Sequence, residues 1–127
     1  MEEDEIAISD VLPLKFCGVF KHKKLNAMQS ILCRQVLEGD ENLVVAAPTG
    51  SGKTVIHELA IIRLLQKKEA QTSSFDKVKV LFIAPNKALC QQRVMAWQKT
   101  FGDLLGLNVL EVTGDLHFSP RRIFDSR

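Results

Sequence analysis

Hydrophobic and polar residues follow a helical spacing in three parts of the chain. In residues 26–38 (NAMQSILCRQVLE) this spacing predicts a helix, with Asn26 as a possible N-cap and Gly39 as the residue that ends it. The same spacing predicts helices over residues 53–68 and 86–101. The helix at 53–68 is apolar on most of its surface and ends in basic residues, which the negative end of a helix dipole favours.

Short apolar runs separate these helices and predict buried strands. They lie at residues 43–47, 78–84 and 107–112, and Pro85 ends the second of them. The polar residues 69–77 predict a loop between a helix and a strand. Strands that alternate with helices favour a parallel sheet with right-handed crossovers. The pattern therefore predicts a three-layer α/β domain.

Length and composition limit the chain to one globular domain. It has 127 residues, of which 46% are hydrophobic and 25% charged, as is usual for a globular protein. No apolar run approaches the roughly 20 residues that a membrane span needs. The N-terminus, MEEDE, is acidic and lacks the basic and then apolar layout of a secretory signal. We therefore expect an intracellular protein with no membrane partner.

Charge is distributed unevenly along the chain. Residues 1–10 hold five acidic residues and no basic one, which leaves 17 basic residues against 10 acidic ones in the rest. We expect residues 1–12 to form an acidic, flexible N-terminus on a basic body, an arrangement that suits a partner rich in phosphate. A solvated charge run without a partner fits the charge equally well. The widely spaced Cys17, Cys33 and Cys90 predict reduced thiols, and the scattered histidines predict no metal site.

Residues 47–54 read APTGSGKT, which fits the phosphate-binding pattern G-x-x-x-x-G-K-[ST] except that Ala47 replaces the first glycine. The segment follows a predicted strand and opens a predicted helix, as such loops do. Its two glycines can turn successive amides toward phosphate oxygens, and the helix start adds a positive end. Lys53 can reach the β- and γ-phosphates, and the Thr54 hydroxyl can ligate Mg²⁺. The sequence therefore predicts an ATP and Mg²⁺ site formed by Thr49, Gly50, Ser51, Gly52, Lys53 and Thr54.

With alanine first, this loop resembles motif I of superfamily-two helicases, the DEAD- and DExH-box group. The phosphate cradle takes its amides from residues 50–54, so Ala47 and Pro48 need not donate to a phosphate. The resemblance implies a P-loop NTPase domain of RecA-like fold. It further implies that residues 13–115 are only the N-terminal part of a first RecA-like domain, which would be truncated.

A second stretch, LNAMQS at residues 25–30, resembles the Q motif of these helicases. In that motif a glutamine recognises adenine, and an amide such as that of Gln29 both donates and accepts hydrogen bonds. The resemblance therefore implies that Gln29 contacts the adenine of ATP. Considered without its neighbours, Gln29 would be an ordinary surface residue of a helix.

Two further stretches resemble motifs that bind nucleic acid. IAPNKAL at residues 83–89 is similar to motif Ia, which implies that Pro85, Asn86 and Lys87 contact the DNA backbone at a helix start. The family commonly has threonine where Asn86 stands, and a simple strand-to-helix corner would also explain the segment. Thr113 and Gly114 begin TGD, which is similar to motif Ic.

The likeness can be narrowed to one branch of the superfamily. DVLPLKF at residues 10–16, HELAIIRLL at 57–65 and APNKALC at 84–90 resemble the meiotic crossover helicases, in the Ski-like branch of DExH-box DNA helicases. The likeness covers roughly residues 10–115. It implies a nuclear, ATP-dependent 3′-to-5′ DNA helicase acting in meiotic recombination.

No D-E-x-H sequence, which supplies the Mg²⁺-holding acids in this family, occurs in the chain. Residues 116–127 do not resemble the family's continuation, so we expect a fragment with a non-family tail that binds ATP and DNA. A non-catalytic remnant of a helicase is one alternative. Another is a small P-loop kinase, in which VLEVTGD would be a Walker B-like strand and Asp115 would hold Mg²⁺.

Overall fold

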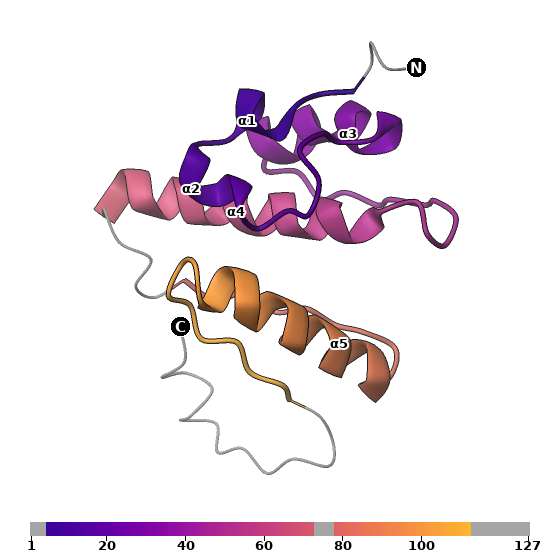
Figure 1. Cartoon of the computed structure of the whole chain (residues 1–127), viewed down its shortest axis with the longest axis vertical. Coiled ribbons are helices and arrows are strands. Elements are labelled where there is room, and N and C mark those ends of the chain that lie inside the picture. The colour runs from indigo at the N-terminus through magenta and orange to yellow at the C-terminus, as the bar shows by residue number, and fades with distance from the viewer. Residues whose placement is uncertain (1–4, 73–77, 113–127) are drawn as a thin grey trace. The chain divides into compact units, whose positions relative to one another are not determined.

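The computed structural model describes residues 5–72 and 78–112 of the chain (Figure 1). The chain divides into two compact units, Met1–Gln71 and Thr72–Arg127. Within the described ranges, no helix is both long enough and apolar enough to cross a membrane.

The described residues of the first unit form four helices. These are α1 (Ile8–Val11), α2 (Leu14–Cys17), α3 (Ala27–Glu38) and the long helix α4 (Lys53–Thr72) (Figure 1). One face of α4 is buried, since its apolar residues recur at short helical intervals along that face. The buried apolar side chains of this unit are Ile8, Leu12, Phe16, Val19, Leu25, Cys33, Val36, Ile56, Leu59, Ile62 and Leu65.

The N-terminal segment is more ordered than its acidic composition predicts. Ile8 and Leu12 are only 3% and 5% exposed, and they are the first residue and the C-cap of α1. Backbone hydrogen bonds from the Ile8 amide to Lys23 (2.9 Å) and from the Leu25 amide to Ile6 (2.8 Å) also tie this segment to the residues just before α3. Within residues 6–12, the burial of these two apolar side chains favours an ordered chain.

The limits of α3 agree with the prediction from local sequence. Asn26 is the N-cap, and its side chain accepts a hydrogen bond from the Gln29 amide at 2.8 Å. Gly39 is the C-cap, with its amide bonded to the Gln35 carbonyl at 3.2 Å. The predicted helix at 26–38 is thus confirmed, with Asn26 serving as its cap.

The predicted helix at 53–68 is confirmed but continues further. Helix α4 extends to Thr72, so residues 69–72 are helical where a loop was predicted, and residues 73–77 lie outside the described part. Lysine, glutamate, alanine and glutamine are good helix formers and favour this extension. Glu69 in the added turn also pairs with Lys15 of α2.

The second unit contains helix α5 (Lys87–Trp97), followed by a π-helical turn, η2 (Gln98–Gly102). These two elements together correspond to the predicted helix at 86–101, with Asn86 as its N-cap. Trp97 packs edge-on against Phe82 and Phe101, with ring centroids 5.0 and 5.9 Å apart. This aromatic cluster holds the segment before α5 against the end of the helix.

The three predicted strands are not formed in the described part of the chain. Residues 43–47, 78–84 and 107–112 lie outside helices, and no strand pairing is assigned to them. Several side chains expected to be buried are exposed, among them Val44 (99%) and Leu81 (83%). A strand exists only where a neighbouring segment pairs with it, and apolar spacing alone does not supply that neighbour. The parallel sheet is therefore not confirmed.

Candidate nucleotide-binding site

The loop of residues 47–54 is a tight turn that leads into α4. Gly50 and Gly52 have positive φ angles of 84° and 90°, which residues with a side chain rarely adopt. Between them, Ser51 donates to the Pro48 carbonyl twice, from its amide at 3.1 Å and from its hydroxyl at 2.6 Å. Pro48 has no amide hydrogen, so it contributes to this loop through its carbonyl alone.

Lys53 lies at the junction of the loop and α4. Its Nζ donates to the Ala47 carbonyl at 2.7 Å, so the ammonium group is held against the first residue of the loop. Both residues before Thr49 therefore act as acceptors within the loop. The carbonyls of Ala47 and Pro48 therefore help to hold the loop together.

The geometry of the loop fits a nucleotide phosphate. The first two amides of α4, those of Lys53 and Thr54, have no partner within the helix and can face an anion. A Cβ built on Gly50 would meet nothing within 4 Å, so space is open beside it. The Ser51 amide is already bonded, and a phosphate at that amide would have to displace the Pro48 carbonyl. Thr54, in the first turn of α4, is the residue that would ligate Mg²⁺.

Two side chains at the start of α3 reach this loop. Asn26 Nδ2 donates to the Ser51 carbonyl at 2.9 Å, and Gln29 Nε2 donates to the Gly52 carbonyl at 3.0 Å. Gln29 Oε1 accepts from the Asn26 amide at 2.9 Å, so both ends of the Gln29 amide group are bonded within the protein. The structure thus places Gln29 beside the phosphate loop, where its predicted contact with adenine remains a proposal.

The contact between Asn26 and the loop was not predicted from the sequence. From the sequence, Asn26 was identified only as a helix cap. Its residue type gave one further sign that it could make a second contact. Serine, threonine and aspartate cap helices as well as asparagine does, but only asparagine adds an NH₂ group that can donate elsewhere.

Gly52 is also required by the close approach of these side chains. A Cβ built on Gly52 would lie 2.3 Å from Gln29 Nε2 and 3.3 Å from Asn26 Nδ2. The first distance is far shorter than any van der Waals contact allows. The glycine therefore provides both the left-handed backbone and the room for α3 to approach the loop.

The predicted nucleic-acid residues of motif Ia lie at the start of α5 in the second unit. Asn86 caps the helix, because its Oδ1 accepts from the Leu89 amide at 2.9 Å. Pro85, Asn86 and Lys87 are exposed. Asparagine is as good a cap as the threonine common in the family, which explains how this departure keeps the corner intact. Thr113 and Gly114, and with them Asp115 and residues 116–127, lie outside the described residues.

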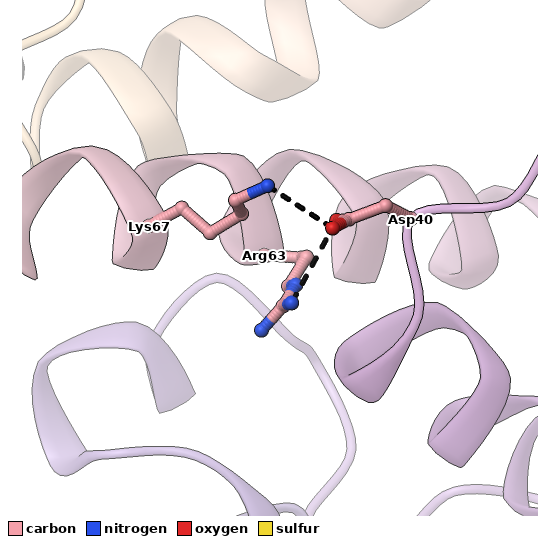
Figure 2. Close-up of polar contacts among 3 residues, drawn as sticks. All are labelled: Asp40, Arg63 and Lys67. Carbon is pink, nitrogen blue, oxygen red and sulfur yellow. Dashed lines mark hydrogen bonds and ion pairs between the residues drawn. The ribbon is translucent and has the colours of Figure 1, made fainter.

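A pocket of about 460 Å³ lies in the first unit between the end of α3 and one side of α4. On its wall, Asp40 pairs with Lys67 (Nζ to Oδ2, 3.2 Å) and Arg63 (Nη2 to Oδ1, 3.6 Å), as Figure 2 shows. The hydrogen bond from Lys67 and its positive charge hold the pKa of Asp40 below its usual value, and Arg63 adds to this effect. These contacts join the segment after α3 to α4.

Among the described residues, the thiols and carboxylates form no cluster suited to a metal centre. Within the described ranges, no group of three or more histidine, cysteine, aspartate or glutamate residues could hold a metal ion. Cys17, Cys33 and Cys90 are free, and burial raises the pKa of the Cys33 thiol.

Residues 26–122 match the DEAD/DEAH box helicase family. The chain belongs to this family. Membership implies a RecA-like P-loop fold and the use of ATP, and it favours the helicase interpretation of VLEVTGD over the kinase alternative.

The relatives that match the chain are much longer helicases. It is 40% identical over 108 residues to the ATP-dependent DNA helicase MER3 of Saccharomyces cerevisiae, covering 85% of this chain and 9% of the relative. It is 48% identical over 105 residues to the probable ATP-dependent DNA helicase HFM1 of Xenopus tropicalis, covering 82% and 8%. The RQC trigger complex helicase SLH1 of S. cerevisiae is 35% identical over 109 residues, covering 86% and 5%. The chain thus spans less than a tenth of the length of each of these three.

Proposed function

We propose that the chain is the ATP-binding and nucleic-acid-binding portion of an ATP-dependent 3′-to-5′ DNA helicase that acts in meiotic recombination in the nucleus. The observation that carries the proposal is the loop at residues 47–54, in which left-handed glycines, the start of α4 and Lys53 converge. The MER3 and HFM1 relatives, whose names describe ATP-dependent DNA helicases, favour DNA as the nucleic acid.

Each proposed residue has one task. Thr49, Gly50, Ser51 and Gly52 form the loop around the phosphates, Lys53 neutralises their charge, and Thr54 ligates Mg²⁺. Gln29 recognises the adenine, which requires its NH₂ group to leave the Gly52 carbonyl or to share that contact. Pro85, Asn86 and Lys87 contact the DNA backbone, and Thr113 and Gly114 contribute further backbone contacts.

A pair of lysine variants tests the proposal in the intact 127-residue chain. A fluorescent ATP analogue with Mg²⁺ should bind the wild type, and Lys53→Ala should weaken binding about 10- to 150-fold, because a hydrogen bond to a charged group contributes about 1.5–3 kcal/mol. Lys87→Ala is the matched control for nucleotide, since it removes the same charge from the second unit. Equal affinity in wild type and Lys53→Ala would place the nucleotide elsewhere.

The same two variants test the DNA contact with their roles exchanged. Single-stranded DNA should bind in a strongly salt-dependent manner, since the contacts are to phosphates. Lys87→Ala should weaken that binding and reduce its salt dependence, while Lys53→Ala should change it little. DNA affinity that does not respond to Lys87→Ala would remove motif Ia from the proposed interface.

A further inference from the structure

The amide side chains of Asn26 and Gln29 each make two hydrogen bonds with different purposes. Their oxygens complete the capping box of α3, in which Asn26 Oδ1 accepts from the Gln29 amide and Gln29 Oε1 accepts from the Asn26 amide. Their nitrogens are not needed by the helix. Asn26 Nδ2 donates to Ser51 and Gln29 Nε2 donates to Gly52, the two consecutive carbonyls just before α4.

These two carbonyls determine where the next two amides point. In a planar trans peptide the C=O and the following N–H point in opposite directions. When α3 holds the Ser51 carbonyl toward itself, the Gly52 amide is turned away from α3. The Gly52 carbonyl accepts from Gln29 Nε2 and also from the Val55 amide at 3.2 Å, so α3 and the first turn of α4 together set the direction of the Lys53 amide. Both amides belong to the phosphate cradle proposed above.

The loop itself offers little resistance to rotation at this point. Gly52 has no side chain to restrict its backbone, and the neighbouring Ser51 lies between two glycines. The Ser51 amide is held by Pro48, but that bond fixes the peptide before Ser51 and not the one after it. The orientation of the peptide between Ser51 and Gly52 therefore depends on a contact from outside the loop.

We propose that Asn26 is a positioning residue of the phosphate loop, acting through the Ser51 carbonyl to aim the Gly52 amide at the nucleotide phosphate. The role is additional to its cap of α3, and it rests on the proposed function of the loop in nucleotide binding. Residue 26 therefore has to be an asparagine: other good cap residues would hold the helix but leave the loop free.

Two substitutions separate the positioning role from the cap. Asn26→Asp and Asn26→Ser both keep an oxygen that can cap α3. In Asn26→Asp the side chain has no hydrogen-bond donor for the Ser51 carbonyl. In Asn26→Ser the side chain is too short to reach that carbonyl while it caps α3. Asn26→Ala is the control that removes both functions.

The first measurement uses the nucleotide-free chain and nuclear spin relaxation. In wild type the Gly52 and Lys53 amides should have order parameters near the rigid value of about 0.85, and in Asn26→Ser that of Gly52 should fall toward about 0.6. The α3 amides should stay rigid in Asn26→Ser and Asn26→Asp but loosen in Asn26→Ala. An unchanged Gly52 order parameter in both capped variants, with α3 intact, would overturn the proposal.

The second measurement is the dissociation constant of the fluorescent ATP analogue. Loss of one neutral hydrogen bond should weaken binding about two- to tenfold in Asn26→Ser. Asn26→Asp should be weaker still at low salt, since its charge repels the phosphates, and should approach Asn26→Ser as salt is added. Should Asn26→Ser disturb α3, the order parameters of Asn26→Asp decide the outcome. A wild-type chain that binds no nucleotide would refute the proposed function, while the order parameters would still decide the role of Asn26.

Discussion

Gly50 and Gly52 show how two residues with the same backbone conformation can have different requirements. Both have φ angles in the left-handed region, at 84° and 90°. A side chain on Gly50 would extend into open space, whereas one on Gly52 would collide with the Gln29 amide. The second glycine is therefore needed for packing against α3 as well as for the turn.

This difference predicts unequal effects of substituting alanine. Gly50→Ala should destabilise the chain by about 1–2 kcal/mol, the cost of a left-handed backbone for an L-residue. Gly52→Ala should cost more, by about 0.5–1.5 kcal/mol for each hydrogen bond from α3 that has to open. Denaturant unfolding of the two variants measures both values, and equal losses would contradict the close approach between Gly52 and Gln29.

The residues of the phosphate loop could be identified from the sequence because they are contiguous. Seven of the eight positions from 47 to 54 fit a known pattern, and the order of neighbouring elements supports it. The loop contact of Asn26 could not be identified in this way. It joins residues 25 positions apart, and it depends on how α3 approaches α4.

At the scale of elements, α3 was predictable because local chemistry determines both its ends. Asn26 and Gly39 each act within one helical turn, as N-cap and C-cap. The end of α4 was missed because Glu69 interacts with Lys15, which is distant in sequence. The three strands were predicted but are not formed in the described part of the chain, since apolar spacing identifies a segment that could pair but not the partner that pairs with it.

The link between the segment after α3 and α4 is electrostatic and predicts a pH dependence. Asp40 pairs with Lys67 and Arg63, and its pKa is lower in the folded chain than in the unfolded one (Figure 2). A lowered pKa stabilises the fold at pH values above the usual aspartate pKa of about 3.9. That contribution is lost as the pH falls through the lowered value.

Asp40→Asn should therefore lower the melting temperature at pH 7, with the difference from wild type disappearing as the pH falls below the pKa of folded Asp40. Because Asp40 is exposed, the effect should be small and should shrink with added salt. Glu41→Gln is the control, since it removes a charge from the next residue, which has no ion pair in the described part of the chain. A difference between Asp40→Asn and wild type that stays constant down to the acid limit would contradict the ion-pair explanation.

At the scale of the whole chain, binding a nucleotide and hydrolysing it make different demands. The loop at residues 47–54 can hold phosphates, and Thr54 can supply one ligand to Mg²⁺. Hydrolysis also needs carboxylates that hold the metal from its other side and orient the attacking water. In the family that this chain resembles, D-E-x-H supplies those carboxylates, and these 127 residues contain no such sequence.

We therefore expect the 127-residue chain to bind ATP without DNA-stimulated hydrolysis or unwinding, even with saturating Mg²⁺, ATP and single-stranded DNA. The phosphate cradle positions the nucleotide, which is only part of catalysis. In related phosphoryl transfers, an arginine that stabilises the transition state raises the rate by a further factor of roughly 10³–10⁵. Phosphate release, measured with and without DNA, tests this, and binding of the fluorescent ATP analogue in the same samples shows that the site is intact. DNA-stimulated turnover that Lys53→Ala abolishes would refute the expectation. It would mean that another carboxylate completes the metal site, and Asp115→Asn would then be the first variant to examine, because Asp115 follows the predicted strand at 107–112.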